Sequence, residues 1–231
     1  MFDEYHYVPV LKGRQGEYGA LAEADDRVRS NITPLLEIPP IPWDFEAEAP
    51  AKSTAAHVAD VAGRIERSWG EDRRIFLDAG LLSDEDLVEG RHPLALVIES
   101  SRAAGLTVVP VTGLARGDAY DAAVAESLAT DGRGVCLRLE SEDIEEPEDL
   151  PRVLGELLAP LGLAQGDVDL VLDLGPISAE QRWTGATVRL ILAALPDSDQ
   201  WRTLTLLASS FPSTSRVWME IALACSRGRN G

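Results

Sequence analysis

Residues 135–139, Val-Cys-Leu-Arg-Leu, and residues 169–173, Asp-Leu-Val-Leu-Asp, decide the fold class of this chain. Both are short runs of β-favouring residues, and between them residues 150–161 repeat apolar side chains at helical spacing. A strand, a helix and a second strand in this order predict a parallel βαβ unit, because parallel neighbours need a long crossover connection.

The same alternation extends along the whole sequence. Seven β-rich runs predict strands at residues 7–11, 32–37, 74–78, 107–111, 135–139, 169–173 and 203–207. Segments with helical periodicity lie between or after them, at residues 16–28, 51–69, 93–104, 119–130, 150–161, 179–195 and 216–225. We therefore expect a single α/β domain over residues 1–231 with about seven parallel strands.

Two arrangements of such a sheet are compatible with this pattern. One is a TIM-like (β/α) barrel, which typically has eight units in about 250 residues, so this one would be incomplete. The other is an open doubly wound sheet, which usually has a GxGxxG first turn when it binds a dinucleotide. Here the first turn reads Lys12-Gly13-Arg14-Gln15-Gly16-Glu17, which lacks that pattern. The barrel is the preferred prediction and the doubly wound sheet the alternative.

Alternation within the strands predicts which side chains face the helices. Val135, Leu137 and Leu139 form an apolar row, whereas Cys136 and Arg138 lie on the other parity. In a barrel the apolar row faces the helices and the second row faces the lumen. By the same parity, Leu204 and Leu206 are expected to face helices. The lumen core is expected to be buried and to contain Val10, Leu35, Phe76, Val171 and Leu207.

Composition and charge exclude several classes. Hydrophobic residues make up 45% of the chain, as in ordinary soluble domains, which excludes a disordered chain. The 39 acidic and 21 basic residues give a net charge of −18, which argues against direct binding to nucleic acid or anionic membranes. The opening residues lack a leader pattern and no apolar run is long enough to span a membrane, so the predicted location is the cytoplasm.

The strand ends suggest a site. In a barrel, functional residues lie where strands meet their following helices. The last lumen-facing residue of each strand, taken in order, is Lys12, Glu37, Asp78, Thr112, Arg138 with Glu140, Asp173 and Ser209. Charged side chains are rarely buried without partners, so this set needs a joint explanation.

Two explanations compete for these residues. In the first, Lys12 and Arg138 form ion pairs that plug the barrel mouth. In the second, they hold a small anionic, phosphate-bearing ligand, with Arg14, Glu140 and Ser209 as further ligand-binding candidates. Glu37, Asp78 and Asp173 are then the catalytic candidates of a hydrolase or lyase, as general acid and base or, with Glu140, as ligands of a divalent metal such as Mg²⁺. Arg14 has a competing interpretation as a helix cap with Glu17.

Two connections carry further features. Residues 39–43, Pro-Pro-Ile-Pro-Trp, predict a stiff loop after the second strand, and residues 44–50 continue it with three acids. Residues 141–149 contain six acids, which is typical of a solvated loop, with a recognition surface as the alternative.

The opening of the chain resembles the beta-family proteins of bacteria and phages. The resemblance rests on residues 7–14, Tyr-Val-Pro-Val-Leu-Lys-Gly-Arg, continuing to Leu21, and on residues 32–39, Ile-Thr-Pro-Leu-Leu-Glu-Ile-Pro. Later phrases agree: Phe-Leu-Asp at 76–78, Leu-Asp-Leu-Gly at 172–175 and Ser-Ser-Phe-Pro at 209–212.

This resemblance implies a TIM-barrel-like fold and a bacterial or phage origin, without an established activity. Relatives continue with a further strand and helix, so by comparison this chain is expected to be truncated at its C-terminus. The resemblance also supports an alternative function: a non-catalytic module in a phage-defence context, whose acidic surface binds a basic protein partner. The sequence assigns no oligomeric state.

Overall fold

The computed structural model describes residues 2, 5–71, 73–83, 86–176 and 185–209. Its centre is a parallel sheet of seven strands in the order β1-β2-β5-β6-β7-β8-β9. The strands of this sheet are β1 (Val10–Leu11), β2 (Leu35–Glu37), β5 (Arg74–Asp78), β6 (Thr107–Thr112), β7 (Val135–Leu139), β8 (Val168–Pro176) and β9 (Thr203–Ser209). Each strand neighbours the next one in sequence, apart from a small hairpin, β3 (Trp43–Asp44) with β4 (Ala49–Pro50).

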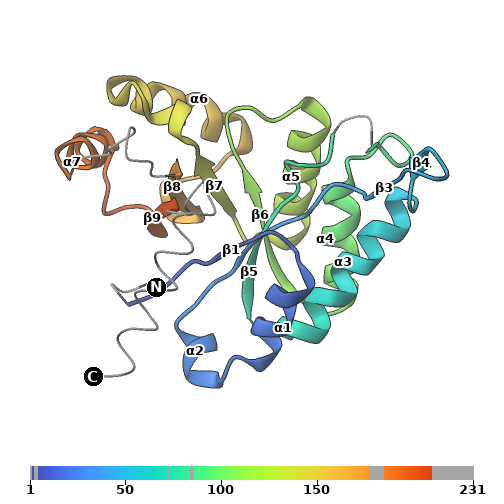
Figure 1. Cartoon of the computed structure of the whole chain (residues 1–231). Coiled ribbons are helices and arrows are strands. Elements are labelled where there is room, and N and C mark those ends of the chain that lie inside the picture. The colour runs from blue at the N-terminus through green and yellow to red at the C-terminus, as the bar shows by residue number, and fades with distance from the viewer. Residues whose placement is uncertain (1, 3–4, 72, 84–85, 177–184, 210–231) are drawn as a thin grey trace, which may run out of the picture.

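Helices lie around the outside of the curled sheet (Figure 1). They are α1 (Gln15–Glu23), α2 (Asp26–Ser30), α3 (Thr54–Trp69), α4 (Pro93–Ala103), α5 (Asp118–Asp131), α6 (Leu150–Leu161) and α7 (Gly185–Ala194). Short 3-10 turns add η2 (Ser141–Ile144), η3 (Pro147–Asp149) and η4 (Gln165–Asp167). Sequence periodicity therefore correctly predicted an α/β fold with seven parallel strands.

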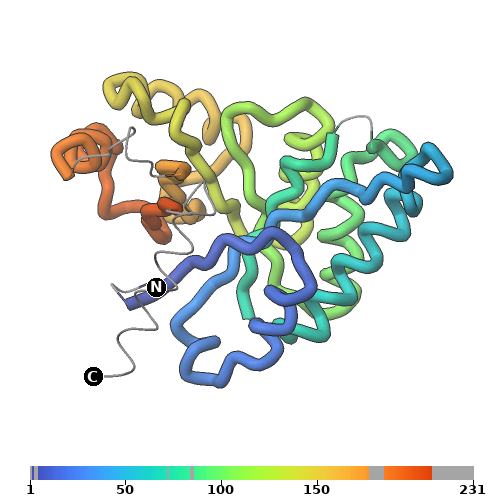
Figure 2. The backbone as a smooth tube through the Cα atoms, viewed as in Figure 1, coloured from blue at the N-terminus to red at the C-terminus, as the bar shows by residue number. Residues whose placement is uncertain are grey.

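The sheet forms a curled half-barrel. Figure 2 shows the chain running through the strands in sequence order, from the blue β1 towards the red β9. Within the described residues β1 pairs only with β2, and β9 pairs only with β8, so these two strands are the edges. Because the strands are parallel and consecutive, their carboxyl ends gather at one rim of the curl.

Apolar side chains form two cores, one on each face of the sheet. The larger core packs strand residues such as Leu77 and Leu137 against helix residues such as Ile65 and Leu154. The smaller core fills the concave face and contains Val8, Leu35, Phe76, Val109, Val111, Cys136, Val171 and Leu207. Four of the five residues expected in the lumen are buried here, and Val10 is half-buried against them.

Several predicted boundaries are wrong, each for a local reason. The first strand keeps only Val10–Leu11, with one further bridge between Tyr7 and Ile32. The helix expected over residues 16–28 is split, because Ala24 is extended and the Asp25 side chain accepts a hydrogen bond from Val28 N to start α2. The stiff loop expected after the second strand instead continues into the β3–β4 hairpin.

The outer face of the last strand also departs from expectation. Leu204 and Leu206 are 38% and 49% exposed, rather than buried under a helix. The helix predicted over residues 216–225 lies outside the described residues. Within the described ranges, no helix is long and apolar enough to cross a membrane.

Candidate functional site

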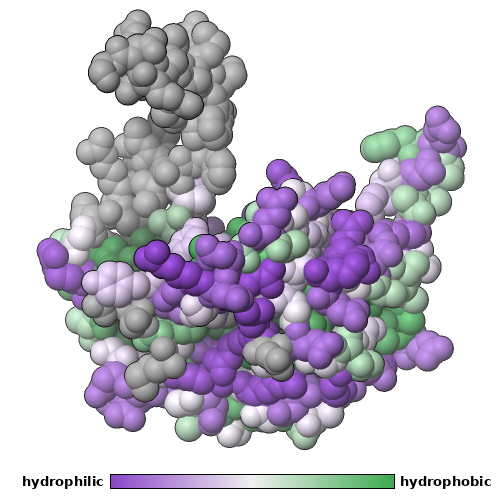
Figure 3. Space-filling model, turned by 90° about the horizontal axis from the view of Figure 1, so that it is seen from below, coloured by the Kyte–Doolittle hydropathy of each residue, from purple (hydrophilic) through white to green (hydrophobic). Residues whose placement is uncertain are grey.

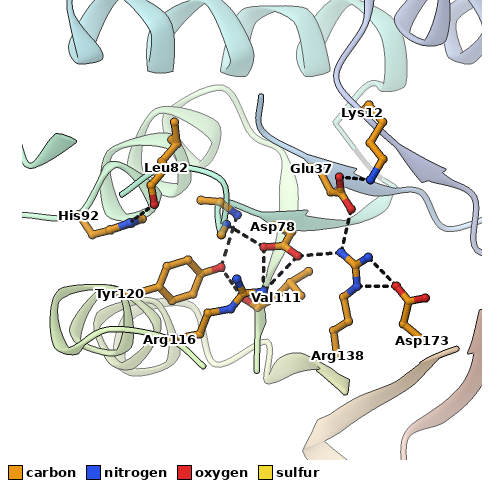
Figure 4. A network of polar contacts seen from close by, with 12 residues as sticks. Lys12, Glu37, Asp78, Leu82, His92, Val111, Arg116, Tyr120, Arg138 and Asp173 are labelled. Atoms are coloured by element: carbon orange, nitrogen blue, oxygen red, sulfur yellow. Dashed lines mark hydrogen bonds and ion pairs between the residues drawn. The ribbon is translucent and has the colours of Figure 1, made fainter. Parts of the chain in front are cut away.

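The structure brings five of the candidate residues together at the carboxyl rim of the half-barrel. Glu37 and Asp78 end their strands, Lys12 follows β1, and Arg138 and Asp173 lie in the carboxyl-terminal halves of β7 and β8. A continuous chain of ion pairs joins these five residues (Figure 4). The alternation of side chains along the strands predicted that these residues lie together, because the carboxyl ends of consecutive parallel strands share one edge of the sheet. Both the ion-pair plug and the ligand site remain compatible with it.

Arg138 lies at the centre of this network. Its Nη1 donates to Glu37 Oε1 at 2.9 Å and to Asp78 Oδ2 at 3.1 Å, while its Nε donates to Asp173 Oδ2 at 2.9 Å. Its side chain is only 11% exposed. Burial alone lowers the pKa of Arg138, but hydrogen bonds to Asp173 and Glu37 outweigh burial and raise the pKa above its ordinary value. The guanidinium is therefore a fixed cation shared by three carboxylates.

Lys12 forms the outer end of the network. Its ammonium pairs with Glu37, and its side chain is 53% exposed. The adjacent Gly13 adopts φ +65°, and a Cβ there would lie 2.8 Å from Pro39 Cδ. Only glycine satisfies both conditions, so Gly13 lets the first βα loop pack against the loop that follows β2.

Arg116 is a third cation of the site, and strand parity did not predict it. Its Nη2 donates to Asp78 Oδ1 at 3.1 Å and to Asp78 Oδ2 at 3.2 Å. It lies in the loop after β6, past the last strand residue, so strand parity does not point to it. The available signal was a single basic residue within the turn from Gly113 to Gly117, between a strand end and a helix start.

The guanidinium of Arg116 is tightly packed between Gly80 and the ring of Tyr120. Its Cζ lies 5.1 Å from the centre of the Tyr120 ring, within the range of a cation–π contact. A Cβ on Gly80 would lie 1.7 Å from Arg116 Nη1, so only glycine leaves room there. Burial raises the pKa of Tyr120, whose hydroxyl donates to Val111 O at 2.6 Å. The ring is thus fixed in a neutral form beneath the cation.

A cavity of about 740 Å³ opens beside these groups. Basic and acidic side chains line it together with small residues: Lys12, Glu37, Asp78, Gly80, Leu81, Gly113, Leu114, Ala115, Arg116, Arg138, Glu140, Glu142 and Asp143. Its size is within the range of small-molecule sites. The lining therefore combines three cations with carboxylates, of which Glu142 and Asp143 belong to η2.

The remaining candidates are placed less centrally. Glu140 is exposed and lines the cavity, but Arg14 and Ser209 do not. The Arg14 backbone N–H donates to Glu17 Oε2 at 2.8 Å, as the helix-cap interpretation predicted. Asp173 is paired with Arg138 without lining the cavity, and Thr112 is buried at the end of β6.

The described residues do not group as metal ligands. No set of three or more His, Cys, Asp or Glu side chains in this part of the chain is arranged to hold a metal ion. The reason is visible in Figure 4: Glu37, Asp78 and Asp173 converge on the guanidinium of Arg138. A divalent cation between these carboxylates would have to displace that guanidinium.

Comparison with known proteins agrees with the resemblance of the opening strands. A family model described as Beta protein matches residues 7–222. The chain belongs to the Beta protein family. A search of curated proteins found no match. The Beta protein match therefore covers every strand of the sheet and all the charged residues of the rim, but it assigns them no activity.

Proposed function

We propose that the rim cavity binds a small phosphate-bearing ligand, with Lys12 and Arg116 as its anion contacts. One observation carries this proposal: two cations from different loops line one cavity, and each keeps unused N–H donors. Within the described residues Arg116 donates only through Nη2, and the Lys12 ammonium has Glu37 as its one partner. A phosphate oxygen can accept from these donors without breaking the pairs already present.

The carboxylates in the cavity lining restrict which phosphate-bearing ligands fit the site. Glu140, Glu142 and Asp143 line the same cavity and supply carboxylate oxygens that accept hydrogen bonds. A ligand with hydroxyl groups beyond its phosphate can donate to these carboxylates, whereas they repel a bare polyanion. The preferred class is therefore a phosphorylated sugar or polyol. A (β/α)-barrel relationship supports the same location, since such barrels carry their sites at this rim.

The proposed residues divide into two roles. Arg138 is most simply a positioning residue, because its donors are engaged by Glu37, Asp78 and Asp173. If the site is catalytic, as in a hydrolase or lyase, Glu37 is the best-placed acid–base candidate. It lines the cavity beside Lys12, whereas Asp173 does not line it. Asp78 then holds Arg116 and Arg138 in place.

Calorimetric titration tests this proposal, using inorganic phosphate and a panel of sugar phosphates. We expect Arg116→Met and Lys12→Met each to weaken binding by about tenfold, the scale of one hydrogen bond to a charged group. Gly80→Ala should act like Arg116→Met, because the added Cβ pushes the guanidinium off Asp78 without touching backbone.

Arg152→Met is the matched control, since Arg152 forms exposed ion pairs on α6 and does not line the cavity. It should leave the affinity unchanged. Binding that is equal in the wild-type protein and in all three rim variants would contradict the proposed site, as would an absence of binding to every phosphate compound.

A further inference from the structure

The β3–β4 hairpin stands out from the body of the molecule as an arm (Figures 1 and 3). Two large aromatic side chains are in solvent on it, with Trp43 53% exposed and Phe45 86% exposed. They lie two residues apart, Trp43 in β3 and Phe45 in the turn that follows it. Exposed large aromatic side chains are enriched in the energetically important part of protein–protein contacts.

Hydrogen bonds within the arm stabilise its conformation. Asp44 Oδ1 accepts hydrogen bonds from Glu46 N at 2.9 Å and from Ala47 N at 3.0 Å, which closes the turn around Phe45. At its base, Ala51 N donates to Pro42 O at 2.7 Å. A surface that is already ordered loses less entropy when a partner binds.

Charge indicates the chemistry of that partner. The side chains between and beside the aromatics are the exposed acids Asp44, Glu46 and Glu48. No ion pair within the described ranges involves any of the three. A partner surface that receives Phe45 must therefore supply its own cations. The net charge of −18 disfavours a second copy of this chain and an anionic membrane as that partner.

We infer that the arm docks a partner protein through an apolar pocket rimmed by Lys and Arg side chains, which receives Phe45 and Trp43. This inference is independent of the ligand proposed for the rim cavity. Pro39, four residues before β3, lies against Gly13, whereas no residue of the hairpin is among those that line the cavity.

Selection from a random peptide library displayed on phage, with the full chain as bait, tests the inference. Recovered peptides should combine Lys or Arg with aromatic or aliphatic residues. Their affinity should fall at least tenfold for Phe45→Ser and for Trp43→Ser, and severalfold for the Glu46→Gln, Glu48→Gln double variant. High salt should weaken binding to the wild-type chain, because the charges involved are exposed.

Leu190→Ser is the matched control, since Leu190 is 65% exposed but lies on α7. It should bind the same peptides as the wild type. Three results of the peptide selection would overturn the inference: peptides without basic residues, peptides that bind Phe45→Ser as well as wild type, or no enriched peptides at all. A dimer in sedimentation that Phe45→Ser dissociates would also overturn it, in favour of self-association.

Discussion

At the scale of single residues, the guanidinium groups of Arg116, in the loop after β6, and of Arg138, in β7, have different roles. Both line the cavity, but Arg138 is surrounded by the carboxylates of Glu37, Asp78 and Asp173, whereas the one ion pair of Arg116 among the described residues is with Asp78. A buried cation shared by three acids is expected to act on stability, because removing it leaves buried negative charges close together. A cation with unused donors is expected to act on binding.

Arg138→Met is therefore predicted to destabilise the fold by about 3–5 kcal/mol, the usual cost of removing one partner from a buried ion pair. Chemical unfolding of the variant and of wild type gives this difference directly. Arg152→Met on the exposed face of α6 serves as control and should unfold like wild type. If Arg138→Met also unfolded like wild type, Arg138 would not be the hub of the network.

At the scale of elements, the seven strands were predictable and the hairpin was not. β-Branched and alternating apolar residues indicate strands at 74–78 and 135–139. The first range forms β5 and the second forms β7, with the predicted bounds. The hairpin strands have two residues each and include Pro50, so neither alternation nor propensity distinguishes them from a loop. The split between α1 and α2 depends on one capping side chain, Asp25.

Strand β5 is predicted to be the most sensitive element of the concave core. Phe76 is fully buried there, opposite Leu35 of β2 and Val109 of β6. Phe76→Ala should cost about 3–5 kcal/mol, because the neighbouring strands cannot collapse into the space left by the ring. Denaturant unfolding measures this loss. A loss below about 1 kcal/mol would mean that the concave face is not packed around Phe76.

The junction between the hairpin and α3 is predicted to lose stability at low pH. Burial lowers the pKa of His57 below its ordinary value of 6.5, and its Nε2 bonds to Pro39 O at 2.8 Å. The unfolded chain therefore takes up a proton at higher pH than the folded chain does. This favours unfolding as the pH falls below about 6.5, until the folded-state pKa is passed.

His57→Gln keeps a donor for Pro39 but removes the titrating group. As the pH is lowered from about 8 to about 5, the unfolding free energy of wild type should therefore fall more than that of this variant. Comparing the two proteins cancels the contributions of the other histidines. A difference that does not change with pH would show that His57 is protonated equally in both states.

At the scale of the whole molecule, topology explains what the sequence could and could not reveal about the site. Consecutive parallel strands place all their carboxyl ends at one rim, so strand parity was enough to predict that Lys12, Glu37, Asp78, Arg138 and Asp173 meet. Parity does not extend into loops. For that reason strand parity did not point to Arg116, which lies in a loop. Its position depends on Gly80 and on the ring of Tyr120, which belong to other parts of the chain.

The most direct test of the proposed site locates an anion in it. Crystals soaked in tungstate, a heavy-atom mimic of phosphate, give an anomalous peak wherever the anion binds. We predict a peak within about 4 Å of nitrogen atoms of both Arg116 and Lys12, inside the rim cavity, because the oxygens that accept from them lie between. This peak should be absent from crystals of Gly80→Ala. A peak only at other surface cations, or an equal peak in both crystals, would contradict the account.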